Sequence, residues 1–306
     1  MSDTPALTQT PKKKEIDTIG ILKKAAKRAG EGGLAGAAAM AINVCSLMWI
    51  RTTINYQYRY GTSMTTAFKT LYSQGGVLRF YQGLAPALIQ GPLSRFGDTA
   101  ANTGVLAALD AFEATENLNV GVKTVFASVG AALFRILLMP VDTFKTTMQV
   151  EGKDGLKKLF AKVKATGPTA FFHGSIAASA ATFVGHYPWF ATYNYLSEAL
   201  PRPGKDEVLL KLARSAVIGF ASSAVSDTCS NSIRVIKVYK QANVDPISYP
   251  EALKRVIAED GIGGLFGRGL STKIIANGLQ GLMFSVLWKL IDEKLFKAGQ
   301  EDKKRS

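Results

Sequence analysis

The stretch Arg135–Gln149 combines an apolar segment, a proline and polar groups at helical spacing. Arg135, Asp142 and Gln149 are seven residues apart, about two helical turns, so all three share one face of a helix. Lys145 follows Asp142 by three residues and lies on a neighbouring stripe. Charges within an otherwise apolar helix usually face a bundle interior or a wet cavity, because lipid cannot solvate them. The alternative is a soluble amphipathic helix with one polar face.

The rest of the composition favours a membrane bundle. The chain has 306 residues, of which 47% are hydrophobic. No run of about eighteen strongly apolar, uncharged residues stands out as a simple anchor. Stretches with at most two charges recur instead, and they are rich in the small residues that membrane helices use for close packing: 30–50, 121–141, 174–197, 215–233 and 274–288. A hydrophilic cavity lined by several helices would explain such moderately hydrophobic segments.

The net charge of +14 indicates anionic partners, such as lipid head groups or acidic metabolites. No basic cluster is interleaved with aromatic residues on one module, so we expect no nucleic-acid partner. The cysteines are Cys45 and Cys229, and the histidines are His173 and His186. This set forms neither a disulfide framework nor a zinc motif, and no nucleophile–base pair is visible. We therefore expect no metal, no cofactor and no enzyme activity.

The ends of the chain differ from its middle. Residues 1–19 are polar and predict a disordered tail, and the acids Asp3, Glu15 and Asp17 argue against a cleavable transit peptide. Residues 20–29 are typical of a basic lead-in at a membrane surface. A charged tail is expected at 298–306. Residues 20–297 then form a single domain.

Three similar units follow one another in this domain, each with a long, a short and a second long helix. The expected helices are 30–56, 62–74 and 84–111, then 121–150, 153–165 and 175–199, then 207–242, 249–259 and 270–295. Pro86 and Pro92 are expected to interrupt the third of them. The glycines Gly83, Gly174 and Gly269 recur at intervals of 91 and 95 residues. The repeats cover about 25–111, 118–200 and 206–297, so we predict an all-α membrane protein with six transmembrane helices around a central cavity.

The chain resembles the mitochondrial carrier family over about 25–297. The family's Pro-x-Asp-x-x-Lys signature stands at Pro140, Asp142 and Lys145, followed by its bracing glutamine at Gln149. A later acidic-Gly to basic-Gly element spans 260–269, with weaker counterparts at 74–83 and 166–174. The resemblance implies a monomeric, multi-pass solute carrier of the mitochondrial inner membrane, with both termini in the intermembrane space and short helices on the matrix side. Its implied partners are a small-molecule substrate and membrane lipids, with cardiolipin as a candidate.

The first and third repeats depart from the signature. The resemblance implies a matrix-side gate at Arg51, Asp142, Lys145, Gln149, Arg234, Lys237 and Gln241. In the third repeat Asp227, Arg234 and Gln241 are again seven residues apart. We hypothesise an inverted ladder, with Arg135 opposite Asp227, Asp142 opposite Arg234 and Gln149 opposite Gln241. A pair between Asp142 and Lys237, as the resemblance implies, competes with it. The first helix offers Ala41, Met48 and Asn55 at matching places, so it should lack an ionic partner.

The resemblance also implies a gate on the opposite side and a set of substrate contacts. The cytosolic-side gate falls on Tyr193, Asn194, Trp288, Lys289 and Asp292, where the usual ion pairs are lost or reversed. Substrate-contact candidates are Gln90, Gly91, Ala181, Thr182, Ala276, Asn277, Arg135, Asp227, Arg95 and Lys273. Gln90 and Asn277 have a plain alternative as bridges between helices. Lys273 has one as a side chain that extends to the membrane interface.

Two functions follow. The first is a carrier that moves a small polar, zwitterionic or anionic metabolite across the mitochondrial inner membrane by alternating access. The second is a carrier-fold protein without transport activity that acts as a membrane adaptor or receptor. The degraded gate motifs favour the second, whereas the retained basic residues Arg51, Lys145 and Lys237 favour the first.

Overall fold

The computed structural model describes residues 33–111, 115, 118–204, 207–243 and 245–283. The tails expected at 1–19 and 298–306 lie outside these residues. Within them, every regular element is a helix, and no strand is present. The all-α expectation is therefore met in the part of the chain that the structure describes.

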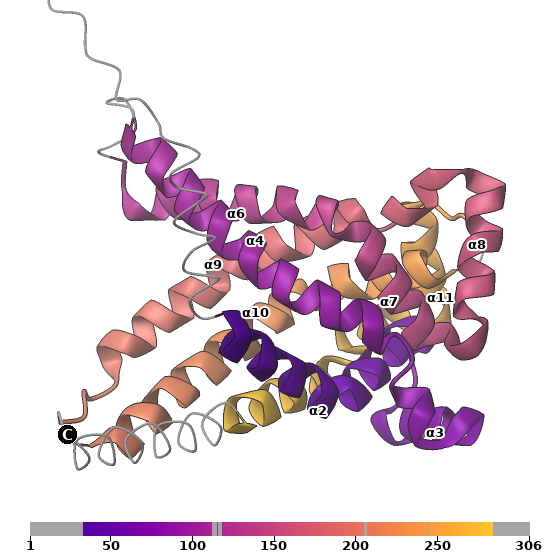
Figure 1. The fold of residues 1–306 in the computed structure, drawn as a ribbon, viewed down its shortest axis with the longest axis horizontal. Helices are drawn as coiled ribbons and strands as arrows, with labels where there is room; N and C mark the ends of the chain where they lie inside the picture. The colour runs from indigo at the N-terminus through magenta and orange to yellow at the C-terminus, as the bar shows by residue number, and fades with distance from the viewer. Residues whose placement is uncertain (1–32, 112–114, 116–117, 205–206, 244, 284–306) are drawn as a thin grey trace, which may run out of the picture.

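Six long helical segments pack around a ring (Figure 1). They are α2 (Gly33–Tyr60), α4 (Leu84–Ala111), α6 (Val120–Leu137) with its continuation α7 (Met139–Glu151), α9 (Ser175–Ala199), α10 (Val208–Ala242) and the helical residues 270–283. Each of α2, α4, α6, α9 and α10 contacts the next, and α10 also contacts α2. Residues 270–283 complete the ring, because Gly278 faces Phe220 of α10 and Gln280 accepts a hydrogen bond from Arg51 of α2.

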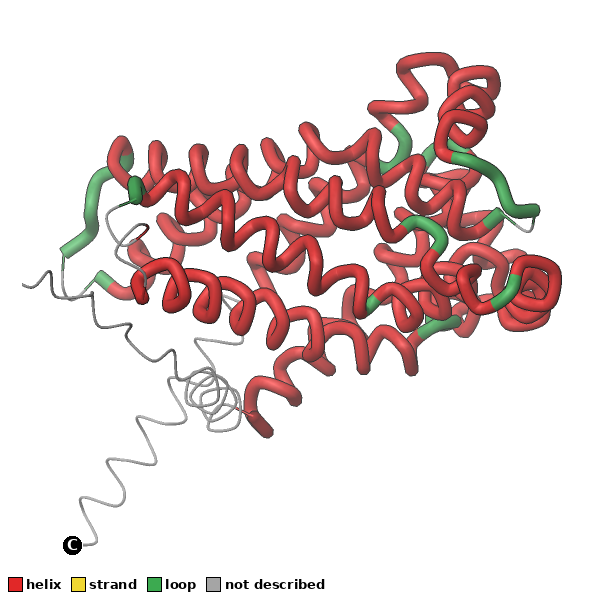
Figure 2. The backbone as a smooth tube through the Cα atoms, turned by 90° about the horizontal axis from the view of Figure 1, so that it is seen from above, coloured by secondary structure: helices red, strands yellow, loops and turns green. Residues whose placement is uncertain are grey.

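Short helices gather at one end of this ring, as Figure 2 shows from above. They are α3 (Met64–Phe80), α8 (Gly155–Thr166) and α11 (Tyr249–Gly267), with single-turn elements η1 (Gly152–Asp154) and η2 (Pro168–Phe172). Ser63 and Ser248 start α3 and α11, since each side chain accepts a hydrogen bond from a first-turn backbone N–H. Both helices run past their predicted ends, but non-helical glycines at 75–76 and 261 divide them close to those ends.

Proline affects the long helices unequally. α6 ends at Leu137 and is bent by 65° relative to the helical stretch Met139–Thr166, beside Pro140. α2 and α10 have serines at the corresponding positions, Ser46 and Ser232, and pass through them without a break. The predicted interruption of the helix 84–111 was wrong. α4 is continuous and contains Pro92, whose missing N–H costs one helical hydrogen bond without ending the helix.

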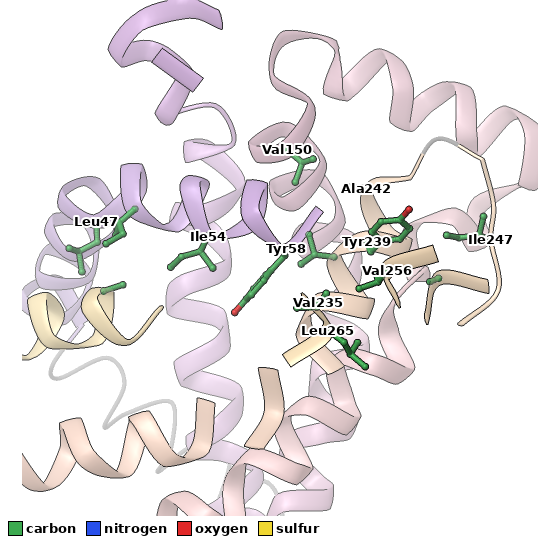
Figure 3. Close-up of a cluster of buried hydrophobic side chains, with 14 residues drawn as sticks. Leu47, Ile54, Tyr58, Val150, Val235, Tyr239, Ala242, Ile247, Val256 and Leu265 are labelled. Carbon is green, nitrogen blue, oxygen red and sulfur yellow. The ribbon is translucent and has the colours of Figure 1, made fainter. Parts of the chain in front are cut away.

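The largest hydrophobic core joins the first and third repeats (Figure 3). Ile54 and Tyr58 of α2 contact a cluster that includes Val235 of α10 and Val256 and Leu265 of α11. All five side chains are buried. Burial of this apolar surface stabilises the end of the ring at which the short helices lie.

The three repeat glycines begin the second long helix of each unit with a positive φ: Gly83 at 89°, Gly174 at 95° and Gly269 at 65°. A Cβ atom on Gly83 would lie 2.9 Å from the carbonyl oxygen of Lys145, on the next repeat. Gly174 similarly approaches α10, and Gly269 approaches α2. Glycine therefore permits both the left-handed turn and the close contact between successive repeats.

We predict that Gly83→Ala lowers the free energy of unfolding by about 1–3 kcal/mol, because the added Cβ meets backbone in a left-handed turn. Thermal unfolding of the purified protein in detergent measures the change. Gly219→Ala is the matched control, since a Cβ there meets nothing within 4 Å. Equal melting temperatures for the two variants would contradict the close approach of the repeats.

Candidate functional site

One buried carboxylate connects all three repeats. Asp142 Oδ1 accepts hydrogen bonds from Lys145 Nζ (2.9 Å) and from Gln90 Nε2 of α4 (2.8 Å). Its Oδ2 accepts from Lys237 Nζ and from Gln241 Nε2 (3.3 Å), both on α10. Lys145 also donates to Gln90 Oε1 (2.6 Å). We call these five residues the Asp142 cluster.

Water has limited access to the Asp142 cluster. The side chain of Asp142 is 7% exposed, and those of Lys145 and Lys237 are 18% and 16% exposed. Charges that are so weakly solvated persist only when they are paired and hydrogen-bonded. The two lysines and the two amides fill both oxygens of the carboxylate, so the arrangement fastens α4, α7 and α10 to one another.

The first repeat joins this network without an acid. Asn55 Nδ2 donates to Gln149 Oε1 (2.5 Å), and Gln149 Nε2 approaches the sulfur of Met48 at 3.5 Å. Arg51 donates to Asn43 Oδ1 (2.8 Å) and to Gln280 Oε1 (3.3 Å). Amide groups thus hold α2 at a level where α7 and α10 use charges.

A second carboxylate, Asp227, lies on α10. Its Oδ1 is 3.5 Å from Arg234 Nη2, and its Oδ2 accepts a hydrogen bond from Asn277 Nδ2 (2.5 Å). Arg234 also donates from Nε to Ser230 Oγ (3.1 Å). Asp227, Ser230 and Arg234 share one face of α10, so the arginine folds back along its own helix.

The predicted inverted ladder was wrong at each of its three steps. Asp142 pairs with Lys237, whereas Arg234 pairs with Asp227. Arg135 donates to Ser94 Oγ of α4 and not to Asp227. The two glutamines also have different partners, because Gln241 donates to Thr143 (2.8 Å) while Gln149 binds Asn55.

The break at Pro140 is the physical reason for the failure of the Arg135 step. A seven-residue spacing places side chains on one face only while the helix is continuous. Arg135 belongs to α6, whereas Asp142 and Gln149 belong to α7 beyond the bend. The face that carries Arg135 is therefore rotated away from the other two.

The substrate-contact candidates have varied environments. Gln90 and Asn277 bridge helices by bonding to Asp142 and Asp227, which is their plain alternative role. Ala181 and Ala276 are buried, Gly91 is half-buried, and Thr182 donates within its own helix. Lys273 is half-buried. The side chain of Arg95 lies outside the described residues.

At the other end of the ring, the described part of the cytosolic-side gate is aromatic. Tyr193 stacks on Trp189 with ring centroids 5.0 Å apart, and Asn194 is exposed. His186 lies one turn before Phe190 and exchanges a 2.7 Å hydrogen bond with Ser128 of α6. Trp288, Lys289 and Asp292 lie outside the described residues. Sequence reasoning missed Trp189, although its four-residue spacing from Tyr193 was a signal for stacking.

Three cations cap helix C-termini around the end that carries the short helices. Arg79 donates to the carbonyls of Gln149 (2.8 Å) and Val150 (2.7 Å) at the end of α7. Lys162 donates to Asn243 O (2.7 Å) just beyond α10, and Arg268 donates to carbonyls at the end of α2. Each cation belongs to the repeat before the helix it caps. They satisfy carbonyls that have no partner within their helices.

Sequence reasoning missed Arg79 and Lys162, because the family's basic position is occupied by Gln82 and His173 in these repeats. Burial lowers the pKa of Lys162 to about 8. Burial and the neighbouring Lys162 and Lys240 lower the pKa of His173 to about 4. The lowered pKa keeps the imidazole neutral at neutral pH, and its buried Nδ1 has no hydrogen-bond partner among the described residues.

Metal binding has no support in the described part of the chain, where no group of three His, Cys, Asp or Glu side chains could hold an ion.

His173 makes stability depend on acid pH. Its folded pKa of about 4 lies below the usual histidine pKa of 6.5, so the unfolded chain binds the additional proton between these values. Stability from this residue is complete above pH 6.5 and is lost as the pH falls towards 4. Melting temperatures between these limits should fall less steeply for His173→Asn than for the wild type. Parallel pH profiles would contradict a neutral imidazole with a lowered pKa.

Removal of the Asp142 charge should destabilise the protein strongly. Asp142→Asn leaves Lys145 and Lys237 close together without a counter-ion, and we expect a loss of about 3–5 kcal/mol in the free energy of unfolding. Asp154→Asn, at an exposed position on η1, is the control. Adding Lys237→Met to Asp142→Asn should restore part of the loss, because it removes one of the unpaired cations. A loss that matched that of Asp154→Asn would exclude Asp142 as the link between repeats.

Comparison with known proteins agrees with this threefold organisation. A family profile described as mitochondrial carrier protein matches residues 22–103, 116–204 and 209–298. No match to a curated protein was found. The three matched segments cover most of the chain. The chain therefore belongs to the mitochondrial carrier family, whose members are solute carriers of the mitochondrial inner membrane rather than enzymes.

Proposed function

We propose that this protein moves a small polar metabolite across the inner membrane by alternating access, with the Asp142 cluster as its matrix-side gate. The observation that carries the proposal is the convergence of all three repeats on one buried carboxylate. A link of this kind can hold one end of a helical ring closed and can break when the repeats move apart. The long helices diverge toward the opposite end (Figure 1).

Six membrane spans follow from the same proposal. α10 is long and apolar enough to cross a membrane alone, and the bent stretch that contains α6 and α7 passes the same test as a pair. Exposed apolar side chains on α6 support a lipid-facing surface, since they recur every three or four residues: Val122, Val125, Phe126, Val129, Leu133 and Leu137. Polar groups on the inner face explain why the other long helices are less hydrophobic.

Topology follows from the number of spans. Six spans place both termini on the same side of the membrane, and the short helices α3, α8 and α11 on the other. In the family arrangement that other side is the matrix, so both termini face the intermembrane space. The Asp142 cluster then lies toward the matrix, close to the helices that connect each pair of spans.

In the proposed cycle, the conformation described here corresponds to a closed matrix gate. Asp142 holds ion pairs with Lys145 and Lys237, whereas the aromatic contact between Trp189 and Tyr193 at the opposite end lies within α9. Opening toward the matrix requires the Asp142–Lys237 pair to separate. The substrate must offset this cost through contacts that differ between the two states.

Uptake by the purified protein in liposomes tests the proposal. We expect saturable uptake of at least one solute from a panel of amino acids, carboxylates, phosphate esters and nucleotides. Asp142→Asn should reduce the uptake rate by about tenfold or more, because it removes the link that closes one side. Gly219→Ala, which touches no neighbour, should transport as the wild type does. Folded protein that transports none of these solutes would identify a carrier fold without transport activity.

A further inference from the structure

We propose that the substrate is a small organic dianion that binds to Lys273 in the interior of the ring. The inference rests on the proposed transport function and adds the chemical class of the solute. Its central observation is a lysine that has no partner in a region where both described acids are already occupied.

Lys273 begins the last helical segment, four residues after Gly269. The charges close enough to act on it come from three different helices: Arg51 of α2, Lys145 of α7, and Asp227 and Arg234 of α10. Lys273 shares one helix face with Asn277 and Gln280, which bond to Asp227 of α10 and Arg51 of α2, so this face is directed towards the interior of the ring. In the part of the chain that the structure describes, the side chain of Lys273 makes no hydrogen bond and no ion pair.

The acids nearby are engaged with donors other than Lys273. Asp142 accepts two hydrogen bonds on each oxygen, from the other members of its cluster. Asp227 is shared between Arg234 and Asn277. The described carboxylates at this level therefore have their oxygens engaged by other donors.

Among the side chains that the structure describes, the charges at this level do not balance. The acids are Asp142 and Asp227, and the cations are Lys145, Arg234, Lys237 and Lys273. These groups give a surplus of two positive charges, and Arg51 is left out of this count. An ammonium group in such a setting is stabilised by an anion and repelled by a cationic solute. Two negative charges on the ligand would neutralise the surplus, whereas a nucleoside triphosphate would exceed it.

Lysine alone does not determine which acid group the dianion carries. An ammonium group is a compact point charge, so it binds carboxylate and phosphate oxygens alike. Dicarboxylates and phosphate monoesters are thus the two classes of dianion that could bind here, and the experiment must distinguish them. Buried Ala276, one turn after Lys273, adds no charge of its own.

Ligand-induced thermal shifts of the purified protein test the site without requiring transport. The probes are succinate and glycerol 3-phosphate as dianions, butyrate as a monoanion, alanine as a zwitterion and putrescine as a cation. We expect one dianion to raise the melting temperature at lower concentration than the other three classes. Succinate alone, or glycerol 3-phosphate alone, would identify the preferred acid group.

Substitutions at Lys273 connect the effect to this residue. Lys273→Gln should raise the half-maximal dianion concentration by about tenfold or more, because it removes one charge-assisted contact. Lys273→Arg keeps the charge and should change that concentration by less than about threefold. Lys164→Gln, on the exposed face of α8, is the control for net charge. The unliganded Lys273→Gln protein should melt no lower than the wild type, since the lysine has no partner to lose.

Different outcomes separate this inference from the proposed function. Dianion stabilisation that depends on Lys273 without uptake into liposomes would retain the site and reject transport. Uptake of a neutral or cationic solute, unchanged in Lys273→Gln, would retain transport and overturn the anion site. Equal dianion affinity in Lys273→Gln and the wild type would overturn it as well. If Lys273→Gln fails to fold, Lys273→Met takes its place, and a dianion affinity equal to that of the wild type would again overturn the anion site.

Discussion

A carboxylate with little access to water can stay ionised between helices only when its oxygens are fully engaged. Asp142 meets this condition through contacts with α4, its own helix α7 and α10. The three repeats therefore contribute different chemical groups to the place where they meet. The second repeat supplies the acid, and the third supplies a lysine. The first repeat supplies two amides, because Gln90 donates to Asp142 and Asn55 donates to Gln149. Threefold pseudosymmetry of the backbone coexists with a single ionic centre.

Around that centre, two other contacts pass from each repeat to the next. The glycines Gly83, Gly174 and Gly269 bring the backbone of one repeat against the first long helix of its successor. A cation from the same repeat then caps the C-terminus of that helix. These contacts use backbone groups, so they tolerate changes in the side chains of the gate. The ring can therefore stay closed at this end even though two of the three signature motifs have diverged.

Local pattern and periodicity made much of the fold predictable. The three units, the short helices and the repeat glycines all leave signals within a single segment of sequence. Contacts across the ring do not. The partners of Arg79 and Lys162 are carbonyls about 70–80 residues away, and carbonyls carry no residue-specific signal. The Arg135 step of the ladder failed for another reason, because it assumed a continuous helix through Pro140. Asp142–Lys237 followed from the family resemblance, whereas Asp227–Arg234 required the coordinates.

The surplus of positive charge connects the gate to the solute in the proposed cycle. Lys145 and Lys237 share one acid, so each has less than a full counter-charge in the closed state. A dianion at Lys273 would add negative charge to the same region and weaken the hold of Asp142 on both lysines. Binding would then lower the cost of separating α7 from α10, which is the contact that must open toward the matrix. An empty carrier lacks this compensation and remains closed on that side.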